Sequence, residues 1–355
     1  MRRGCARRAR PEQGQRGSII VLALWTLFVL SSFAVTMAYA ARQKIMLAIR
    51  LEAHEVLCAV ADAGVRRAMS ELFQDTDLTA DAWTEVWANN EALFRESEVG
   101  RGRFSVKYPA VDPLTGKAGT RYGVEDEGGK LNLNRATTEE LARLFGSTAG
   151  LSADGALDLA FCVIDWRDED SFFGHPQYGA EDEYYQGLAR PYTCKDAPFE
   201  VLEELLMVKG MDHEIFSRLS PYLTVHGDTP LNINTVPHEV LMAVGLSKEV
   251  ADKIHLYRVG EDQKEGTTDD QTFATASGIV SALTQFLPFS SDEVAQVSNL
   301  VAAGRFGTSS GFFSVHCEAW IKSDPASRLQ VHAVVERALT HEGKPTGRIK
   351  LWSEG

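Results

Sequence analysis

The chain has few of the features that mark an enzyme or a zinc protein. Its 355 residues include only five cysteines, and no two of them have the CxxC spacing of a zinc ribbon or a thioredoxin-type redox site. The nine histidines are dispersed, and there is no HExxH motif and no Walker-type glycine loop. A hydrolase that used the acidic residues is a weaker alternative, because no nucleophile or base is recognisable. We therefore predict that the protein is not an enzyme.

Basic residues are scarce outside the N-terminus. The formal net charge is -13, and residues 1–17 hold six arginines and one glutamate, so 30 basic and 48 acidic residues remain, with a net charge of -18. So acidic a body repels phosphate backbones and suits divalent cations or basic protein surfaces. Nucleic acid is therefore a disfavoured partner.

Charged residues are absent from residues 17–41, and this apolar run is long enough to cross a ~30 Å hydrocarbon layer as one helix. The arginines precede it, which by the positive-inside tendency keeps that end cytoplasmic. We expect a single-pass protein of the bacterial inner membrane whose bulk is periplasmic. The alternative is a secretory signal cleaved at Ala38-Tyr39-Ala40, although its apolar region would exceed the usual ~7–15 residues.

Cysteine chemistry depends on that location. In the oxidising periplasm two cysteines could form a disulfide, whereas buried free thiols are equally compatible with the sequence. The candidates outside the leader are Cys58, Cys162, Cys194 and Cys317.

The junction at Gly17 resembles that of type IV prepilins, in which a basic leader and a glycine precede an unbroken apolar helix. The resemblance implies cleavage after Gly17 by the prepilin peptidase and N-methylation of Ser18. The fifth mature residue in that class is usually Glu, which is thought to neutralise a neighbour's N-terminal amine, and here it is Leu22. The minor pseudopilin of the K class in type II secretion is known for lacking this Glu.

Alternating residues predict strands at both ends of the head. Residues 103–108 and 121–124 favour a hairpin around a turn at 116–119, and residues 315–321, 329–335 and 349–351 alternate in the same way. Helical spacing continues from the apolar run to about residue 63, so the distal half of that helix should lie on the sheet. Residues typical of helix starts and ends dominate from about residue 132 to residue 305. We predict an α+β, pilin-like fold in which a long N-terminal helix packs on a small antiparallel sheet with a large helical domain inserted.

One internal repeat relates residues 131–141 to residues 231–241. Asn134 and Thr235 are candidate helix caps. The simpler interpretation is two similar strand-to-helix turns, and the alternative is a pair of helix-hairpin-helix elements with a hairpin at Gly245. The alternative function is thus a membrane-anchored DNA-binding protein, against which Glu249 and Asp252 argue by their charge.

The most acidic segment runs from residue 163 to residue 186. Two acidic loops brought together could supply the six to eight oxygen ligands of a hard cation such as calcium, although the spacing does not match an EF-hand. A solvated acidic loop is the alternative.

Several boxes in order along the chain, at 126–134, 165–168, 179–185, 195–199 and 209–211, are similar to the K-class pseudopilin. The resemblance implies a minor pseudopilin at the tip of the type II secretion pseudopilus, which initiates or caps assembly with the I- and J-class minor pseudopilins. It also implies structural calcium in the inserted domain. The candidate ligands are Asp168, Asp170, Glu181, Asp182 and Glu183, with Asp165 and Asp196 in reserve.

The predicted organisation has five segments. They are a leader at 1–17, a transmembrane helix at 18–41, a periplasmic helix and first strands at 42–130, the inserted helical domain at 131–305 and the C-terminal strands at 306–355.

Overall fold

The computed structural model describes residues 16–75, 77–111, 116–227, 230–263, 267, 269–339 and 345–355, and most of the predicted leader lies outside them. The chain divides into two units, residues 1–56 and 57–355, each considered by itself. The dividing point falls within one continuous helix, α1 (Arg16–Gln74). The five-segment division proposed from the sequence stays a prediction.

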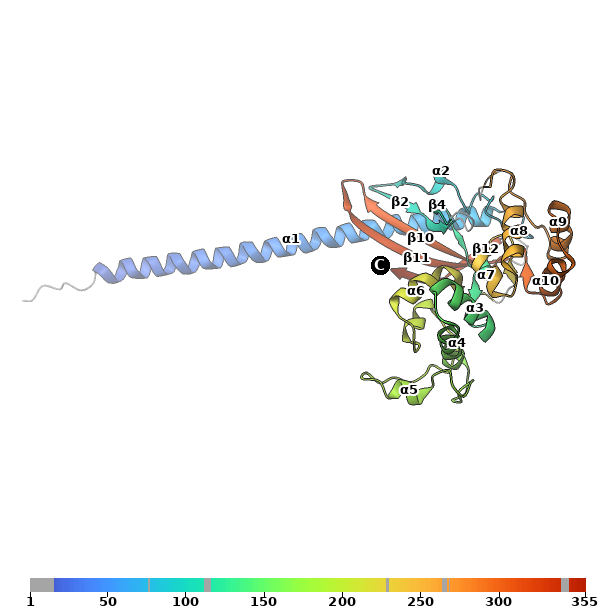
Figure 1. Cartoon of the computed structure of the whole chain (residues 1–355). Helices are drawn as coiled ribbons and strands as arrows, with labels where there is room; N and C mark the ends of the chain where they lie inside the picture. The colour runs from blue at the N-terminus through green and yellow to red at the C-terminus, as the bar shows by residue number, and fades with distance from the viewer. Residues whose placement is uncertain are drawn as a thin grey trace, which may run out of the picture. The chain divides into compact units, whose positions relative to one another are not determined.

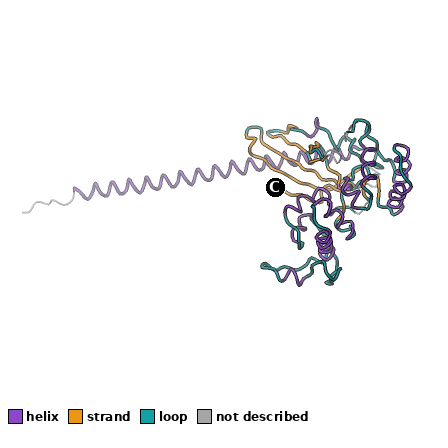
Figure 2. The backbone as a smooth tube through the Cα atoms, viewed as in Figure 1, coloured by secondary structure: helices purple, strands orange, loops and turns teal. Residues whose placement is uncertain are grey.

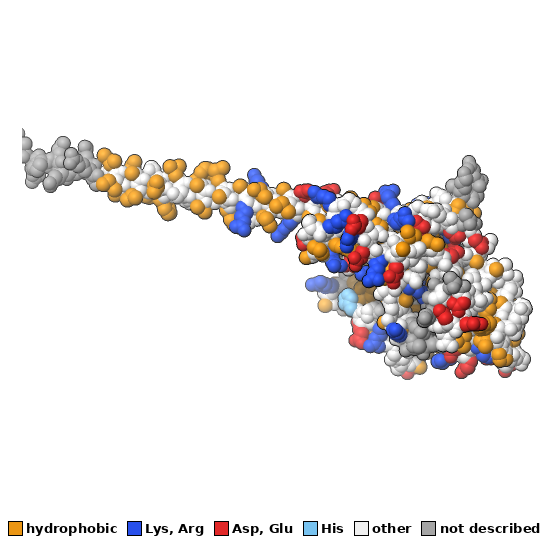
Figure 3. Space-filling view, turned by 90° about the horizontal axis from the view of Figure 1, so that it is seen from above, with side chains coloured by type: hydrophobic (Ala, Val, Ile, Leu, Met, Phe, Trp, Pro, Cys, Tyr) orange, Lys and Arg blue, Asp and Glu red, His pale blue; other side chains and the backbone are white. Residues whose placement is uncertain are grey.

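In the first unit, α1 presents an exposed surface that holds no charged residue from Ser18 to Ala41. Every side chain from Ser18 to Glu52 is exposed, and an 18-residue window has a mean hydropathy of 2.3. Figure 3 shows hydrophobic side chains along this stretch before the first Lys and Arg side chains appear. The helix is long and apolar enough to cross a membrane. Leu22 is 66% exposed, so no described residue covers the position where most pilins carry Glu.

The second unit contains a six-stranded antiparallel sheet in the order β1-β2-β10-β11-β12, with β5 paired to β10 (Figures 1 and 2). The long strands come from the alternating C-terminal segments, as the sequence predicts. The strands of this sheet are β1 (Ser97–Val99), β2 (Gly102–Val106), β5 (Glu125–Asp126), β10 (Phe312–Ile321), β11 (Asp324–Leu339) and β12 (Pro345–Glu354).

The last turns of α1 lie on this sheet, so the expected packing is confirmed for them, whereas Ile45 and Ile49, earlier in the predicted distal half, are exposed. Leu57, Val60 and Val65 are buried there. A Cβ on Gly64 would lie 2.6 Å from the sulfur of Cys317 on β10 and 3.0 Å from the ring of Phe104 on β2. The glycine thus permits a close approach of helix and sheet.

A hairpin forms, but its two strands are not the predicted ones, since β4 (Ala118–Arg121) shares only Arg121 with the predicted strand 121–124 and overlaps the predicted turn at 116–119. Strand β3 (Tyr108–Val111) pairs with β4, so Tyr108 lies opposite Arg121. Strand β2 instead pairs with β10 and β1, and its contact with β10 extends to Lys107, whose backbone N–H donates to the carbonyl of His316. Local alternation cannot show this change of partner.

The region between β5 and β10 is mainly helical, and the predicted α+β class is confirmed. Its helices and those flanking it are short. They are α2 (Glu91–Phe94), α3 (Thr138–Ala149), α4 (Ala153–Arg167), α5 (Asp182–Gln186), α6 (His213–Leu219), α7 (His238–Ala243), α8 (Lys248–Arg258), α9 (Ile279–Phe286) and α10 (Ser291–Ala302), with 3-10 turns at Glu127–Gly129, Leu202–Met207, Ser220–Tyr222 and Ala276–Gly278.

The internal repeat is a repeat of structure. Strand β6 (Leu131–Asn132) pairs in parallel with β7 (Leu223–Thr224), and β8 (Leu231–Asn232) pairs in parallel with β9 (Phe306–Gly307). The first strand of each pair leads through a turn into two helices, α3 and α4 or α7 and α8. The interpretation as two similar strand-to-helix turns is therefore confirmed.

The helix caps differ from those predicted. In the first copy, Thr137 caps α3 in a capping box with Glu140, and in the second copy Pro237 occupies the N-cap of α7. Asn134 and Thr235 come too early, because the carbonyl of the preceding Asn132 or Asn232 still closes a turn at each of these positions.

In both copies the second asparagine instead fastens a distant phenylalanine backbone. The side-chain oxygen of Asn134 accepts from the N–H of Phe199 at 2.8 Å, and that of Asn234 accepts from the N–H of Phe273 at 2.8 Å. Each side-chain amide donates back to the carbonyl of the same phenylalanine. The paired bonds close the loop that follows α4 or α8.

Replacing Asn234 with alanine should lower the free energy of unfolding by about 2–3 kcal/mol, because the side chain is 3% exposed and its loss leaves buried backbone groups without partners. Asn134→Ala is the matched control at the equivalent, less buried position, and we expect about half of that loss. Urea unfolding of the full chain in detergent measures both. Equal losses would contradict the burial argument.

Cys162, Cys194 and Cys317 are free and buried. Of the two possibilities left open by the sequence, the structure shows buried free thiols at these three positions.

Candidate metal centre

Helix α4 and the loop after it are fastened to the core by two charged side chains. The Arg167 guanidinium donates to the carbonyls of Leu133 and Ala136, which fixes the end of α4. Asp165 is fully buried, and its two oxygens accept from the N–H groups of Gly174 and Ala180, both at 3.0 Å. Asp165 thus holds the returning loop, and its oxygens are occupied by backbone donors.

The loops beside α5 (Figure 1) hold acidic side chains that lie close together. Ligand atoms of Asp168, Asp170 and Glu181 all lie within 4.8 Å of one another, and those of Glu181, Cys194 and Asp196 do the same. Glu181 belongs to both groups and is only 3% exposed. Glu181 is thus shared by two adjoining groups of possible ligands, one with Asp168 and Asp170 and one with Cys194 and Asp196.

Several of these buried oxygens have no hydrogen-bond partner among the described residues. They are both carboxylate oxygens of Glu181 and one oxygen each of Asp168 and Asp196. Burial and the neighbouring carboxylates raise the pKa of Glu181 to about 7 and that of Asp168 to about 6. Buried carboxylates without donors are costly, and a bound cation offsets that cost.

The donors fit a hard cation better than a soft one. Carboxylate oxygens are the ligands that Ca²⁺ takes, whereas zinc and copper favour thiolate or imidazole. Burial raises the pKa of the Cys194 thiol to about 12, so this sulfur stays protonated. The nearby cations are engaged elsewhere, since Lys195 pairs with Glu204 and Lys209 with Asp158. Calcium in this position would neutralise the cluster and join the two loops.

The predicted ligands divide into two groups. Asp168, Asp170 and Glu181 are brought together, and the reserve candidate Asp196 joins them. Asp182 instead accepts from the backbone N–H of Cys194 at 2.8 Å, and Glu183 is exposed. The reason is local, because helix α5 begins at Asp182 and turns these side chains away from the extended residue Glu181.

The backbone conformation of Asp196 marks it as a candidate ligand in a way that the sequence does not show. Its φ is +49°, a left-handed conformation that non-glycine residues seldom adopt. This conformation turns the carboxylate toward Glu181, and strained residues of this kind gather at ligand sites.

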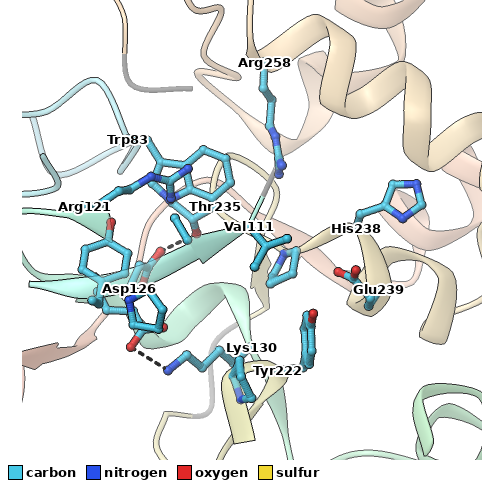
Figure 4. Close-up of a pocket in the computed structure, with 16 residues that line it drawn as sticks. Trp83, Val111, Arg121, Asp126, Lys130, Tyr222, Thr235, His238, Glu239 and Arg258 are labelled. Carbon is cyan, nitrogen blue, oxygen red and sulfur yellow. Dashed lines mark hydrogen bonds and ion pairs between the residues drawn. The ribbon is translucent and has the colours of Figure 1, made fainter. Parts of the chain in front are cut away.

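A separate cavity of about 170 Å³ lies between the β3–β4 hairpin and the second repeat (Figure 4). The Arg121 and Arg258 guanidiniums lie 4.1 and 4.6 Å from the ring of Trp83. Asp126 accepts from Thr235 and Asn232, and Lys130 pairs with Glu125. Because Asp126 and Glu125 are already engaged, this cavity is less suited to a cation than the loop cluster.

The helix-hairpin-helix alternative gains no support from the second repeat. Gly245, with φ of +106°, joins α7 to α8 as such a hairpin requires. The adjacent Lys248, however, lies 2.8 Å from Asp252 in an ion pair, and Glu249 is exposed beside it. An acidic surface of this kind repels a phosphate backbone.

Comparison with known proteins gives a consistent family. Residues 124–228 match the family described as "Type II secretion system (T2SS), protein K". Type II secretion system protein K of Aeromonas hydrophila is 35% identical over 94 residues, which are 26% of this chain and 28% of that protein. The protein of the same name from Pseudomonas aeruginosa is 26% identical over 197 residues, 52% of each chain. The matched part thus spans between about a quarter and half of these curated relatives.

The fold has a solved counterpart. A chain in the crystal structure of the GspK-GspI-GspJ complex from enterotoxigenic Escherichia coli superposes with a TM-score of 0.65 at 16% identity, covering 87% of this chain and 99% of that one. The two share a fold from the sheet to the helical region. The resemblance seen in the sequence is therefore confirmed: residues 124–228 are similar to type II secretion system protein K, and the chain around them has the pilin-like α+β fold of that structure.

Proposed function

We propose that the chain is a minor pseudopilin at the tip of a type II secretion pseudopilus, where it initiates or caps assembly with I- and J-class pseudopilins. The observation that carries the proposal is the fold match over 99% of a chain from the GspK-GspI-GspJ complex, together with the family match at residues 124–228. Its work would be mechanical rather than enzymatic.

The exposed apolar helix supports membrane insertion and packing against sister helices. The side chains from Ser18 to Ala41 are all exposed and uncharged, and such a surface is stable in a bilayer or against other apolar helices, not in water. Leu22 offers no carboxylate to a neighbour's N-terminal amine. The first subunit of a filament has no preceding neighbour whose N-terminal amine needs that carboxylate. Leu22 therefore favours a position at the tip.

The size of the head also supports a position at the tip of the pseudopilus. Residues 57–355 form one compact unit, whose helical region adds far more bulk than a small pilin sheet alone. Such a unit is hard to repeat along a tightly wound filament. The calcium bound at the loop cluster would be structural, keeping the two acidic loops ordered.

Maturation and assembly test the proposal together. The full chain, co-produced with the prepilin peptidase and I- and J-class pseudopilins, should mature to an N-methylated Ser18 and co-purify with both partners from detergent extracts. Mass spectrometry of the N-terminus and affinity isolation are the measurements.

Two matched glycine variants sharpen the test. Gly17→Ile should remain uncleaved and lose most of the co-purification, whereas Gly14→Ile, in the same leader, should mature normally. A mature protein that begins at Ala41, or a failure to co-purify after correct maturation, would refute the proposal.

A further inference from the structure

We propose that the chain has a second divalent-cation site, formed by Asp75, Asp81 and Glu85, which takes an oxygen-ligated ion of the calcium class. These residues belong to the segment after α1 and are separate from the loop cluster around Glu181. The proposal does not rest on the membrane or tip role.

The three carboxylates converge on one point. A carboxylate oxygen from each of Asp75, Asp81 and Glu85 lies within 4.8 Å of the others. Asp81 is held rigidly, since its N–H donates to the carbonyl of Thr308 at 2.8 Å and its Oδ2 accepts from the N–H of Ser310 at 2.6 Å. A preformed position for one ligand reduces the ordering cost of binding.

Asp81 supplies the independent sign of a ligand. Its side chain is fully buried, and its Oδ1 has no hydrogen-bond partner among the described residues. An ionised carboxylate oxygen in this setting costs free energy unless a donor or a cation reaches it. Two further carboxylates, those of Asp75 and Glu85, converge on the carboxylate of Asp81. A cation is the fitting partner, because it attracts all three carboxylates, which otherwise repel one another.

The charge balance indicates a divalent ion. Among the described residues, Arg337 forms ion pairs with the cluster, through Asp75 at 3.2 Å and through Asp81. Three carboxylates and one guanidinium leave two negative charges.

The site occupies a structural junction. Asp75 follows the end of α1, Arg337 belongs to β11, and Thr308 and Ser310 lie on the path from the helical region into β10. The Thr308 hydroxyl also donates to the carbonyl of Thr79 at 2.8 Å. A cation bound by Asp75, Asp81 and Glu85 would fasten the segment after α1 to the point where the chain returns to the sheet.

Calcium binding by the full chain in detergent tests the site. The background is the Asp168→Asn/Glu181→Gln variant, which removes the loop cluster. After dialysis against CaCl₂, this background should retain about one bound Ca²⁺ per chain, and saturating Ca²⁺ should raise its Tm by about 5 °C relative to EDTA. Elemental analysis and thermal unfolding are the measurements.

Adding Glu85→Gln to this background should abolish both the bound ion and the Tm shift. The glutamine keeps an oxygen that can accept from the Trp87 indole N–H, as Glu85 does now. Glu249→Gln, at an exposed acid on α8, removes the same charge and should change neither quantity. Asp75→Asn serves as a second site variant that keeps the Arg337–Asp81 pair.

Two results would overturn the inference. One is a background chain that binds no Ca²⁺. The other is unchanged Ca²⁺ binding after both Glu85→Gln and Asp75→Asn. In EDTA the Glu85→Gln variant should melt no lower than its parent, which separates lost binding from lost folding.

Discussion

The Arg337→Met variant is expected to lose about 3–5 kcal/mol of unfolding free energy, the largest effect of a single substitution in this chain. The Arg337 side chain is 5% exposed, pairs with Asp75 and Asp81 and donates to the carbonyl of Ser310 at 2.9 Å. Its removal leaves two buried carboxylates without their counter-charge. Methionine retains the apolar stem of the side chain but loses the guanidinium, whose carbon lies 4.9 Å from the centre of the Phe313 ring.

Arg348→Met is the matched control on the adjacent strand β12. Arg348 pairs with Glu336, but its side chain is 69% exposed, so we expect a loss below about 1 kcal/mol. Urea unfolding of the full chain in detergent compares the two variants. Similar losses would mean that the buried cluster around Arg337 contributes no more than a surface ion pair.

Removal of bound calcium is expected to have the second large effect, and that effect should depend on pH. Chelation should lower the Tm by about 5 °C or more at pH 8, because the cluster around Glu181 then holds ionised carboxylates without donors. With calcium in excess, the ion keeps these groups ionised and compensates their repulsion.

The sign of the pH dependence follows from the raised pKa values of Glu181 and Asp168, about 7 and about 6 in the folded protein. Unfolded side chains titrate near ~4, so the folded state binds more protons between these values. The stability that these groups contribute is complete below pH ~4 and is lost as the pH rises through 6 and 7. The chelated protein should therefore melt lower at pH 8 than at pH 5.

Thermal unfolding with and without EDTA at both pH values checks this result. In the Asp168→Asn/Glu181→Gln variant the amide groups do not titrate, so its Tm in EDTA should fall less between pH 5 and pH 8 than that of the wild type. An identical fall in both proteins would show that the cluster is not the source.

Local patterns predicted those elements whose cause is local. The apolar run from Ser18 and the alternation in the C-terminal segments set the helix and the long strands before any tertiary contact is known. The main-sheet partner of β2 is β10, far along the sequence, and directly after Lys107 the chain changes to the β3–β4 pairing. No window around Lys107 contains that information.

The candidate site shows the same limit. Asp168, Asp170 and Glu181 stand in a visibly acidic stretch, and the fold brings them together. Asp196 contributes through a left-handed backbone that its residue type does not announce. The cluster of Asp75, Asp81 and Glu85 is still harder to anticipate, because its counter-charge comes from Arg337 on a strand more than two hundred residues away.

The fastening of Phe199 and Phe273 by the two asparagines has a consequence for the length of the chain. In the first copy the hydrogen bonds between Asn134 and Phe199 hold the end of the stretch 168–198. In the second copy those between Asn234 and Phe273 hold the end of the shorter stretch 259–272. Because doubling a closed loop adds only about 0.6 kcal/mol of closure entropy, either stretch can grow while the repeat beneath it is unchanged. An epitope or a fluorescent label inserted between α8 and Phe273 would therefore leave the fold of the second repeat unchanged.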